Sequence, residues 1–506
     1  MDWTSHDFAG VNDAWARHLM ELPGVHSKRS VYAFKETVVI WGNPHLPAFT
    51  HQPPVCNLLT MSANHQSREQ RYTPAEEQFH TSSQYPKPVN WTGSVWAIRN
   101  DYPGPPRFSF RALITPVSDA TLDAPWLTID FKTHPGEYAK TIKEYCWEGN
   151  RQVDFVVQEN RHRAWYHAPW MHASANGREP LKGLTFERSM PPHEFASTQT
   201  HALQNWAIGF YNSPGASTFG YVWKDPNNPN WTHNLKFPEG TCVFKLLFTT
   251  ASDDQVFTMK GAPGWHAVIS PQPNLKVAPR SGAERNDHAS QVRLIQVDWA
   301  VVDSRAPIGW VFGTFMYNSN LWRLDDPWDR LTAIGVQWGN DPQLNQAAYD
   351  AGKRPVESWI NPEAESLRKQ LGGRRPFWGY NGRLNGPADN FISACASCHS
   401  VAQLITSAPI TQPRKLVNNK FENVKSGEAF SARGAVSADY SLQLKIGFEN
   451  YQTWLAEQAS LPRHIPFSTP GRRVVFRAKP GAAERSHEGK DPMQETKDSI
   501  VARAKL

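Results

Sequence analysis

The chain has 506 residues, of which 40% are hydrophobic and 20% are charged, and this balance indicates a globular protein rather than a disordered one. The formal net charge of +6 is spread along the chain without a Lys/Arg block of the kind that binds nucleic acid. No stretch approaches the roughly 20 apolar residues of a membrane-spanning helix, so we expect neither a nucleic-acid partner nor a membrane span.

We expect residues 1–90 to form an irregular or helical segment. The N-terminus lacks the basic stretch and apolar run that are typical of a secretory signal peptide. Three of the five cysteines, Cys56, Cys146 and Cys242, stand far apart in the sequence. Such spacing is not typical of a disulfide framework, and we expect these three to be small buried hydrophobic residues.

Residues 91–375 are predicted to form a β-rich domain. Bulky residues recur at every second position, which is typical of half-buried strands. The pattern covers residues 108–114, 206–210, 242–248, 295–301 and 310–316, and in the fourth stretch Gln296 and Asp298 lie between the apolar positions. Strands separated by loops rich in Pro, Asn, Asp and Gly favour an antiparallel sandwich or barrel.

One segment of this region, RHRAWYHAPWMH, contains His162, His167 and His172. It allows two interpretations, a second metal site or wall beside a cofactor, and a strand and turn with hydrogen-bonded imidazoles. The second is the ordinary role of histidines near an aromatic core.

Residues 371–390 are dense in Gly, Pro and Asn, which predicts a boundary before a small helical module at 376–460. We expect helices near 391–404 and 439–458. The second has Leu444, Phe448, Tyr451 and Leu455 at helical spacing, with Asp439 as a candidate N-cap. Residues 461–506 are predicted to be an extended arm. The predicted fold class is therefore α+β and multidomain.

The motif that carries chemistry is Cys395-Ala396-Ser397-Cys398-His399, which matches the C-x-x-C-H pattern of covalent haem attachment. Two thiols on one helical turn can form thioethers with the two vinyl groups of a haem, and the next residue, His399, can then ligate the iron. The small Ala396 and Ser397 are expected to let the porphyrin edge approach the backbone. With this chain's Cys and His content, chance produces such a motif roughly twice per thousand sequences, which favours a real site.

Two other interpretations of the cysteine pair stay open. A structural zinc site needs four ligands, and no second C-x-x-C or H-x-x-x-H lies at finger spacing. A thioredoxin-type redox pair is expected between a strand and a helix, whereas a Gly/Asn-rich loop precedes this motif.

The C-terminal module resembles a cytochrome c domain, with a haem-bearing helix opened by CASCH and a later amphipathic helix. More narrowly, GRLNGPADN and CASCHS, with WYHAPWMH, FPEGTCVFKLLFT, VRLIQVDWAVVDSRAPIGWVFGTFMYN and VQWGNDP upstream, resemble a mainly bacterial family of large single-haem cytochrome c domain proteins. The resemblance covers most of residues 150–460. It implies one covalent haem c and electron transfer.

The sequence departs from the simplest cytochrome c pattern at the sixth iron ligand. No Met lies between residues 400 and 492, where such domains usually supply one. The downstream candidates are His464 and Met493, and Met316 or His167 could reach in from the β-rich region. An unfilled position would leave the iron open to a small ligand, and the axial ligand also tunes the reduction potential.

We therefore expect an electron-transfer protein in which the large domain docks a redox donor or acceptor protein or shields the haem edge. One alternative is a haem-dependent oxidoreductase or small-ligand sensor with an open iron site. Another is a β-sandwich binding module with a vestigial motif. Because haem is normally attached outside the reducing cytosol, we expect the periplasm or the mitochondrial intermembrane space.

Overall fold

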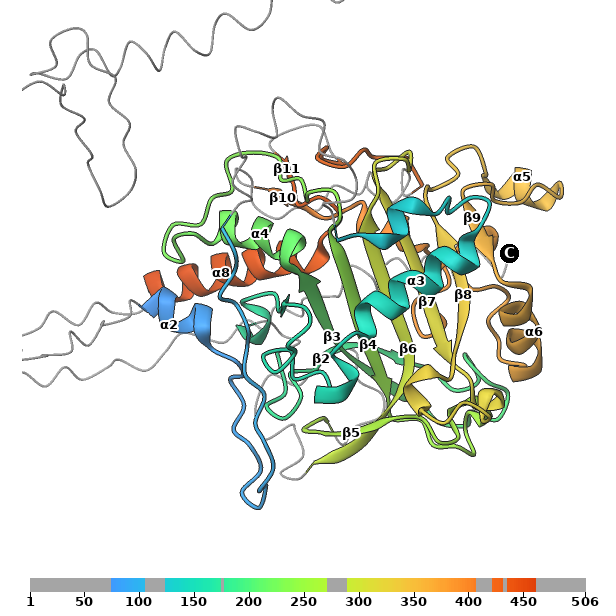
Figure 1. Cartoon of the computed structure of the whole chain (residues 1–506), viewed down its shortest axis with the longest axis horizontal. Helices are drawn as coiled ribbons and strands as arrows, with labels where there is room; N and C mark the ends of the chain where they lie inside the picture. The colour runs from blue at the N-terminus through green and yellow to red at the C-terminus, as the bar shows by residue number, and fades with distance from the viewer. Residues whose placement is uncertain are drawn as a thin grey trace, which may run out of the picture. The chain divides into compact units, whose positions relative to one another are not determined.

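The computed structural model describes residues 74–104, 123–173, 177–270, 289–405, 421–430 and 435–460. Its centre is a nine-stranded antiparallel sheet in the order β1-β3-β4-β6-β7-β8-β9, with β2 pairing with β3 and β5 with β6 (Figure 1). The strands are β1 (Trp165–Tyr166), β2 (Thr185–Met190), β3 (Leu203–Asn212), β4 (Cys242–Thr249), β5 (Gly264–Ala267), β6 (Ser290–Val302), β7 (Trp310–Tyr317), β8 (Leu331–Gln337) and β9 (Ser358–Ile360). A small second sheet pairs β10 (Gln403–Ile405) with β11 (Ala435–Ser437).

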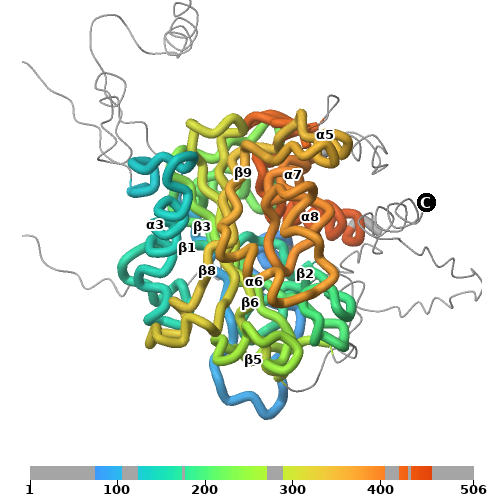
Figure 2. Tube along the Cα trace, turned by 90° about the vertical axis from the view of Figure 1, so that its right-hand side faces the viewer, coloured from blue at the N-terminus to red at the C-terminus, as the bar shows by residue number. Residues whose placement is uncertain are grey.

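The helices lie around this sheet. They are α2 (Pro74–His80), α3 (Pro135–Trp147), α4 (Ser213–Val222), α5 (Gln346–Asp350), α6 (Pro362–Leu371), α7 (Cys395–His399) and α8 (Leu442–Ser460). Figure 2 shows α3 on one side of the sheet and α7 and α8 on the other. None of the helices in the described ranges is long and apolar enough to cross a membrane.

Four of the five predicted strands are confirmed as β3, β4, β6 and β7, and they lie side by side in that order. The fifth, at 108–114, lies outside the described residues. The nine strands β1 to β9 form one large sheet with helices and loops on both faces, instead of the predicted sandwich of two large sheets. Every residue of β3 and β7 is therefore buried, where the alternation predicted only half-buried strands.

The alternation sorts the side chains into cores on the two faces of the sheet. The α3-side core contains Phe210, Phe244 and Trp299 together with Tyr138 and Ile142 of α3. The opposite face carries two clusters. The α8-side core joins Tyr211 and Phe312 to Leu444 and Phe448, and the α6-side core joins Leu247 and Met316 to Leu367. Hydrophobic packing thus continues across residue 375, the expected boundary between the two modules.

The expected boundary at 371–390 is a loop, but it is a buried one. Arg375 and Arg383 are 3% and 0% exposed. The Arg375 guanidinium donates hydrogen bonds to the carbonyls of Trp378, Gly386, Pro387 and Asp389. Arg383 donates to those of Asn340, Asp341 and Leu344. Hydrogen bonds to a charged donor are among the stronger ones in proteins, so these two side chains fix the loop that precedes the cysteine motif.

Both predicted helices exist, with different bounds. The first is only the single turn α7, because the chain after His399 turns back to pair as β10 with β11. The second, α8, begins three residues after Asp439. The hydroxyl of Ser441 accepts from the backbone N–H of Leu444 at 3.2 Å and so takes the N-cap role predicted for Asp439. Leu444, Phe448 and Tyr451 are buried as predicted, whereas Leu455 is 37% exposed.

Candidate functional site

A cavity of about 590 Å³ lies between the sheet and the segments that follow residue 384. Its volume is within the range of roughly 300–1,000 Å³ that is usual for small-molecule and cofactor sites. The sheet side is lined by Glu187, Gly209, Tyr211, Val243, Lys245, Asp298, Ala300 and Phe312, among others. The other side is lined by Asn385, Asp389, Ser393, Cys395, Cys398, His399, Tyr440, Leu442, Gln443 and Ile446.

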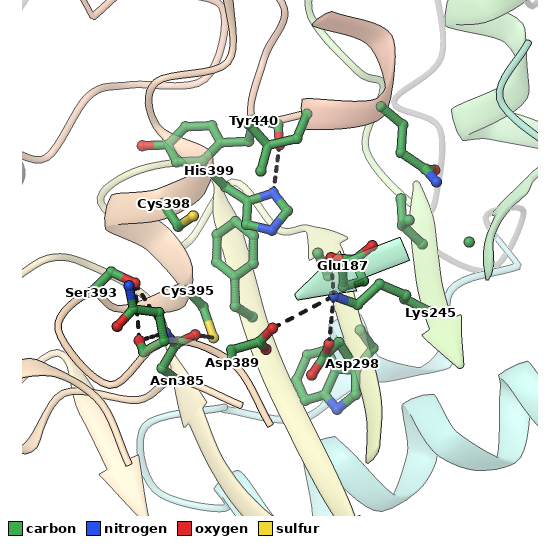
Figure 3. A pocket seen from close by; sticks show the side chains of 18 of the residues that line it. Glu187, Lys245, Asp298, Asn385, Asp389, Ser393, Cys395, Cys398, His399 and Tyr440 are labelled. Carbon is green, nitrogen blue, oxygen red and sulfur yellow. Dashed lines mark hydrogen bonds and ion pairs between the residues drawn. The ribbon is translucent and has the colours of Figure 1, made fainter. Parts of the chain in front are cut away.

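All three residues singled out in the motif line this cavity (Figure 3). Cys395, Cys398 and His399 are partly exposed, whereas Ala396 and Ser397 between them are buried and do not line it. The small residues therefore allow α7 to pack against the core, instead of admitting a ligand to the backbone as the sequence suggested.

Hydrogen bonds at its N-terminal end fix the orientation of α7. The backbone N–H of Cys395 donates to the carbonyl of Leu384 at 3.0 Å, and that of Ala396 donates to Oε1 of Gln337 at 3.0 Å. The Ser397 hydroxyl accepts from the N–H of Ala394 at 2.9 Å. Because the first N–H groups of a helix have no partner within it, these contacts both satisfy the helix start and determine which face of the turn meets the cavity.

The imidazole of His399 is held in one tautomer. Its Nδ1 lies 2.8 Å from the carbonyl oxygen of Tyr440, and a carbonyl can only accept, so Nδ1 carries the proton. Burial lowers the pKa of His399 to about 4, although the hydrogen bond to Tyr440 opposes this shift. The ring is therefore neutral at pH 7 with a lone pair on Nε2. Figure 3 shows this second nitrogen pointing away from Tyr440.

The Tyr440 carbonyl reaches His399 through a left-handed backbone conformation at two consecutive residues. Asp439 and Tyr440 both have positive φ, 46° and 65°, a conformation that is costly for residues other than glycine. The Asp439 carboxylate is 1% exposed and accepts hydrogen bonds from the N–H groups of Phe237 and Gly427, the hydroxyl of Ser426 and the indole of Trp310. These contacts hold the turn that presents the carbonyl to His399.

The thiol of Cys395 does not resemble a redox-active nucleophile. Burial and the nearby carboxylates of Asp298 and Asp389 raise its pKa well above the ordinary value. Reactive cysteines of thioredoxin-type motifs have lowered pKa values instead. Cys395 is therefore a neutral thiol, and neither motif cysteine is in a disulfide.

A charged cluster lines the same cavity. The Lys245 ammonium lies 3.1 Å from Asp298, 3.8 Å from Glu187 and 4.0 Å from Asp389 (Figure 3). About 26% of the Lys245 side chain is exposed, and this surface faces the cavity. Burial raises the pKa of Asp298 to about 6, and Lys245 only partly offsets this rise. For Asp389, burial is outweighed by Lys245 and a hydrogen bond from Gln296, which lower its pKa.

Sequence reasoning assigned no role to these charged residues. Asp298 was identified only as a polar position between apolar ones, and Lys245 holds the corresponding position in β4. The sequence signal for the position of Lys245 and Asp298 is their alternation with bulky neighbours, which places them on the face of the sheet opposite the α3-side core.

The expected sixth ligands fall in different places. His464 and Met493 lie outside the described residues. Met316 is 0% exposed in the α6-side core, and His167 is buried with its Nδ1 accepting from the N–H of Arg99. Neither lines the cavity, whereas Met171, which sequence reasoning did not select, does.

The histidine-rich segment fits the interpretation of a strand and turn. Trp165 and Tyr166 form β1, His162 is exposed, and His172 lies 3.2 Å from Oε1 of Gln78. In the part of the chain that the structure describes, no three His, Cys, Asp or Glu side chains are arranged to hold a metal ion. A haem site does not need such a cluster, because the porphyrin itself supplies four ligands to the iron and a single protein imidazole can supply a fifth.

Comparisons of the chain with models of protein families, with curated proteins and with solved structures found no match.

Proposed function

We propose that the cavity holds one haem c, joined by thioethers to Cys395 and Cys398 and ligated through Nε2 of His399, and that the protein transfers electrons. One observation carries the proposal. The two thiols and the unprotonated nitrogen of His399 line a single cavity, and Nδ1 is tied to a backbone carbonyl. A metal-ligating histidine usually donates a hydrogen bond from its other ring nitrogen, because this bond fixes the tautomer and makes the ligating nitrogen more basic.

The walls of the cavity fit a flat, largely apolar cofactor. The ring of Phe312 lies 5.2 Å from that of His399, and Tyr211, Val243, Leu442 and Ile446 add further apolar surface. When bound, haem supplies one-electron chemistry, and the polarity of the wall around it tunes its potential. In this proposal residues 376–460 supply the attachment motif of a cytochrome c-like module, and the β-rich region supplies the opposite wall and shields the haem.

The test is covalent attachment in a host with a cytochrome c maturation system. We expect the purified chain to gain the mass of one haem, to keep it through acid–acetone extraction and to give a haem c pyridine haemochrome spectrum. The double variant Cys395→Ser/Cys398→Ser should lose the adduct, and the matched control Cys242→Ser should keep it. A wild-type chain that leaves the same host without covalent haem would refute the proposal.

The charged cluster favours a second candidate function. A Lys and three carboxylates beside the cofactor cavity could donate or accept protons for a small molecule bound to an open iron site, as in a haem-dependent oxidoreductase or a ligand sensor. Carbon monoxide added to the reduced protein separates the candidates. An unchanged spectrum supports the electron carrier, and a strong shift supports the open site. An electron carrier requires a redox partner protein, and covalent haem attachment implies an extracytoplasmic location.

A further inference from the structure

Two other cysteines meet in the α3-side core, on the face of the sheet opposite the cavity. Cys146 lies in the last turn of α3 and Cys242 is the first residue of β4. They are 2% and 0% exposed, and their sulfur atoms lie 3.6 Å apart although the residues are 96 positions apart in sequence. The prediction that both are buried is confirmed, but no sequence pattern indicates that they are neighbours.

The side chain of Asn212 links the surroundings of the two sulfurs by hydrogen bonds. The side chain of Asn212 accepts from the N–H of Cys242 at 3.0 Å and donates to the hydroxyl of Tyr145, next to Cys146, at 3.1 Å. A disulfide bond is about 2.05 Å long, so the sulfurs have to approach by roughly 1.5 Å. Since the two sulfurs are already in contact, rotation of the side chains can supply most of this approach.

We propose that Cys146 and Cys242 form a disulfide bond that ties α3 to β4 when the chain folds in an oxidising environment. Each thiol gives up its hydrogen and the two sulfurs join, while two electrons and two protons convert a disulfide oxidant such as glutathione disulfide to two thiols. Burial in the folded protein raises the pKa of Cys146, and the thiolate is the reacting form. The bond therefore forms during folding, before α3 covers the sheet.

The sheet keeps this pair apart from the motif cysteines. Cys242 and Phe244 face the α3-side core, although Phe244 also borders the cavity, and the alternating Val243 and Lys245 of β4 face the other way. Cys395 and Cys398 lie on that other side with α7, across the sheet from α3 (Figure 2). Once β4 is in place, exchange between the two pairs requires unfolding, so one pair can be oxidised while the other stays reduced.

The test maps thiols in the full wild-type chain, refolded in a buffer of reduced and oxidised glutathione. After acid quenching, free thiols are alkylated in denaturant without reductant, and the digest is examined by mass spectrometry. We expect the peptides containing Cys146 and Cys242 as a linked pair that separates on reduction. The variant Cys56→Ser should keep this pair, and Cys146→Ser should leave Cys242 to be alkylated.

The proposal is overturned if both cysteines are alkylated after oxidative refolding, or if either is linked to another cysteine. The wild-type map decides the question even if Cys146→Ser does not fold. Because no haem is needed, the result is independent of the function proposed above.

Discussion

Replacing Asp439 tests whether a buried carboxylate positions His399, the histidine that we propose as the iron ligand. The residue accepts four hydrogen bonds, two of them from the buried donors Phe237 N and Trp310 Nε1 at 2.6 and 3.3 Å. Each buried donor left without an acceptor costs about 1–3 kcal/mol. We therefore expect Asp439→Ala to lower the free energy of unfolding by roughly 2–6 kcal/mol, and Asp439→Asn, which keeps one oxygen, to lower it by less.

Urea denaturation measures these losses, and Asp101→Asn is the matched control. Asp101 is 72% exposed in an ion pair with Arg99, and such pairs contribute about 0–1 kcal/mol. A second readout separates positioning from stability. In the haem-loaded protein Asp439→Asn should shift the reduction potential, because the Tyr440 carbonyl moves relative to His399, while Asp101→Asn should not. The reasoning fails if both Asp439 variants unfold within about 0.5 kcal/mol of wild type.

Three further predictions concern the cavity and the histidine-rich segment. Because Met171 lines the cavity and Met316 does not, the variant Met171→Ala tests Met171 as the sixth iron ligand. It should open the iron of the reduced, haem-loaded protein to carbon monoxide, whereas Met316→Ala should leave the spectrum unchanged, and equal spectra would exclude Met171 from this role. Lys245→Met should lower the free energy of unfolding by about 1–3 kcal/mol at pH 8, because it leaves the half-buried carboxylates of Asp298 and Asp389 without a counter-charge. The loss should be smaller at pH 5, where Asp298, whose pKa is raised to about 6, is protonated; an equal loss at both pH values would contradict this. Burial lowers the pKa of His172 to about 4, so the unfolded chain binds this proton more readily. His172 should therefore contribute about 3 kcal/mol to the fall in the free energy of unfolding between pH 6.5 and 4, and urea titrations of His172→Gln should show a pH dependence flatter by that amount.

The hydrogen-bonded environment of Asp439 also explains an error of sequence reasoning. An Asp a few residues before an apolar helical stripe is a typical N-cap, and local patterns contain nothing against that role. The structure instead uses Ser441 as the cap and turns Asp439 toward Phe237 and Gly427. These partners come from distant parts of the chain, so no local pattern could have identified them.

The sequence by itself determined only features that are periodic along the chain or confined to a short segment. Strands β3, β4, β6 and β7 follow from alternation, because one face of each must be apolar. The C-x-x-C-H motif is defined by the spacing of two thiols and an imidazole. Tertiary structure alone decided that Lys245, Asp298 and Asp389 form one cluster beside Cys395, and that Cys146 touches Cys242. Contacts between residues far apart in sequence depend on strand order and register, and these are set by the packing of the whole sheet rather than by any single segment.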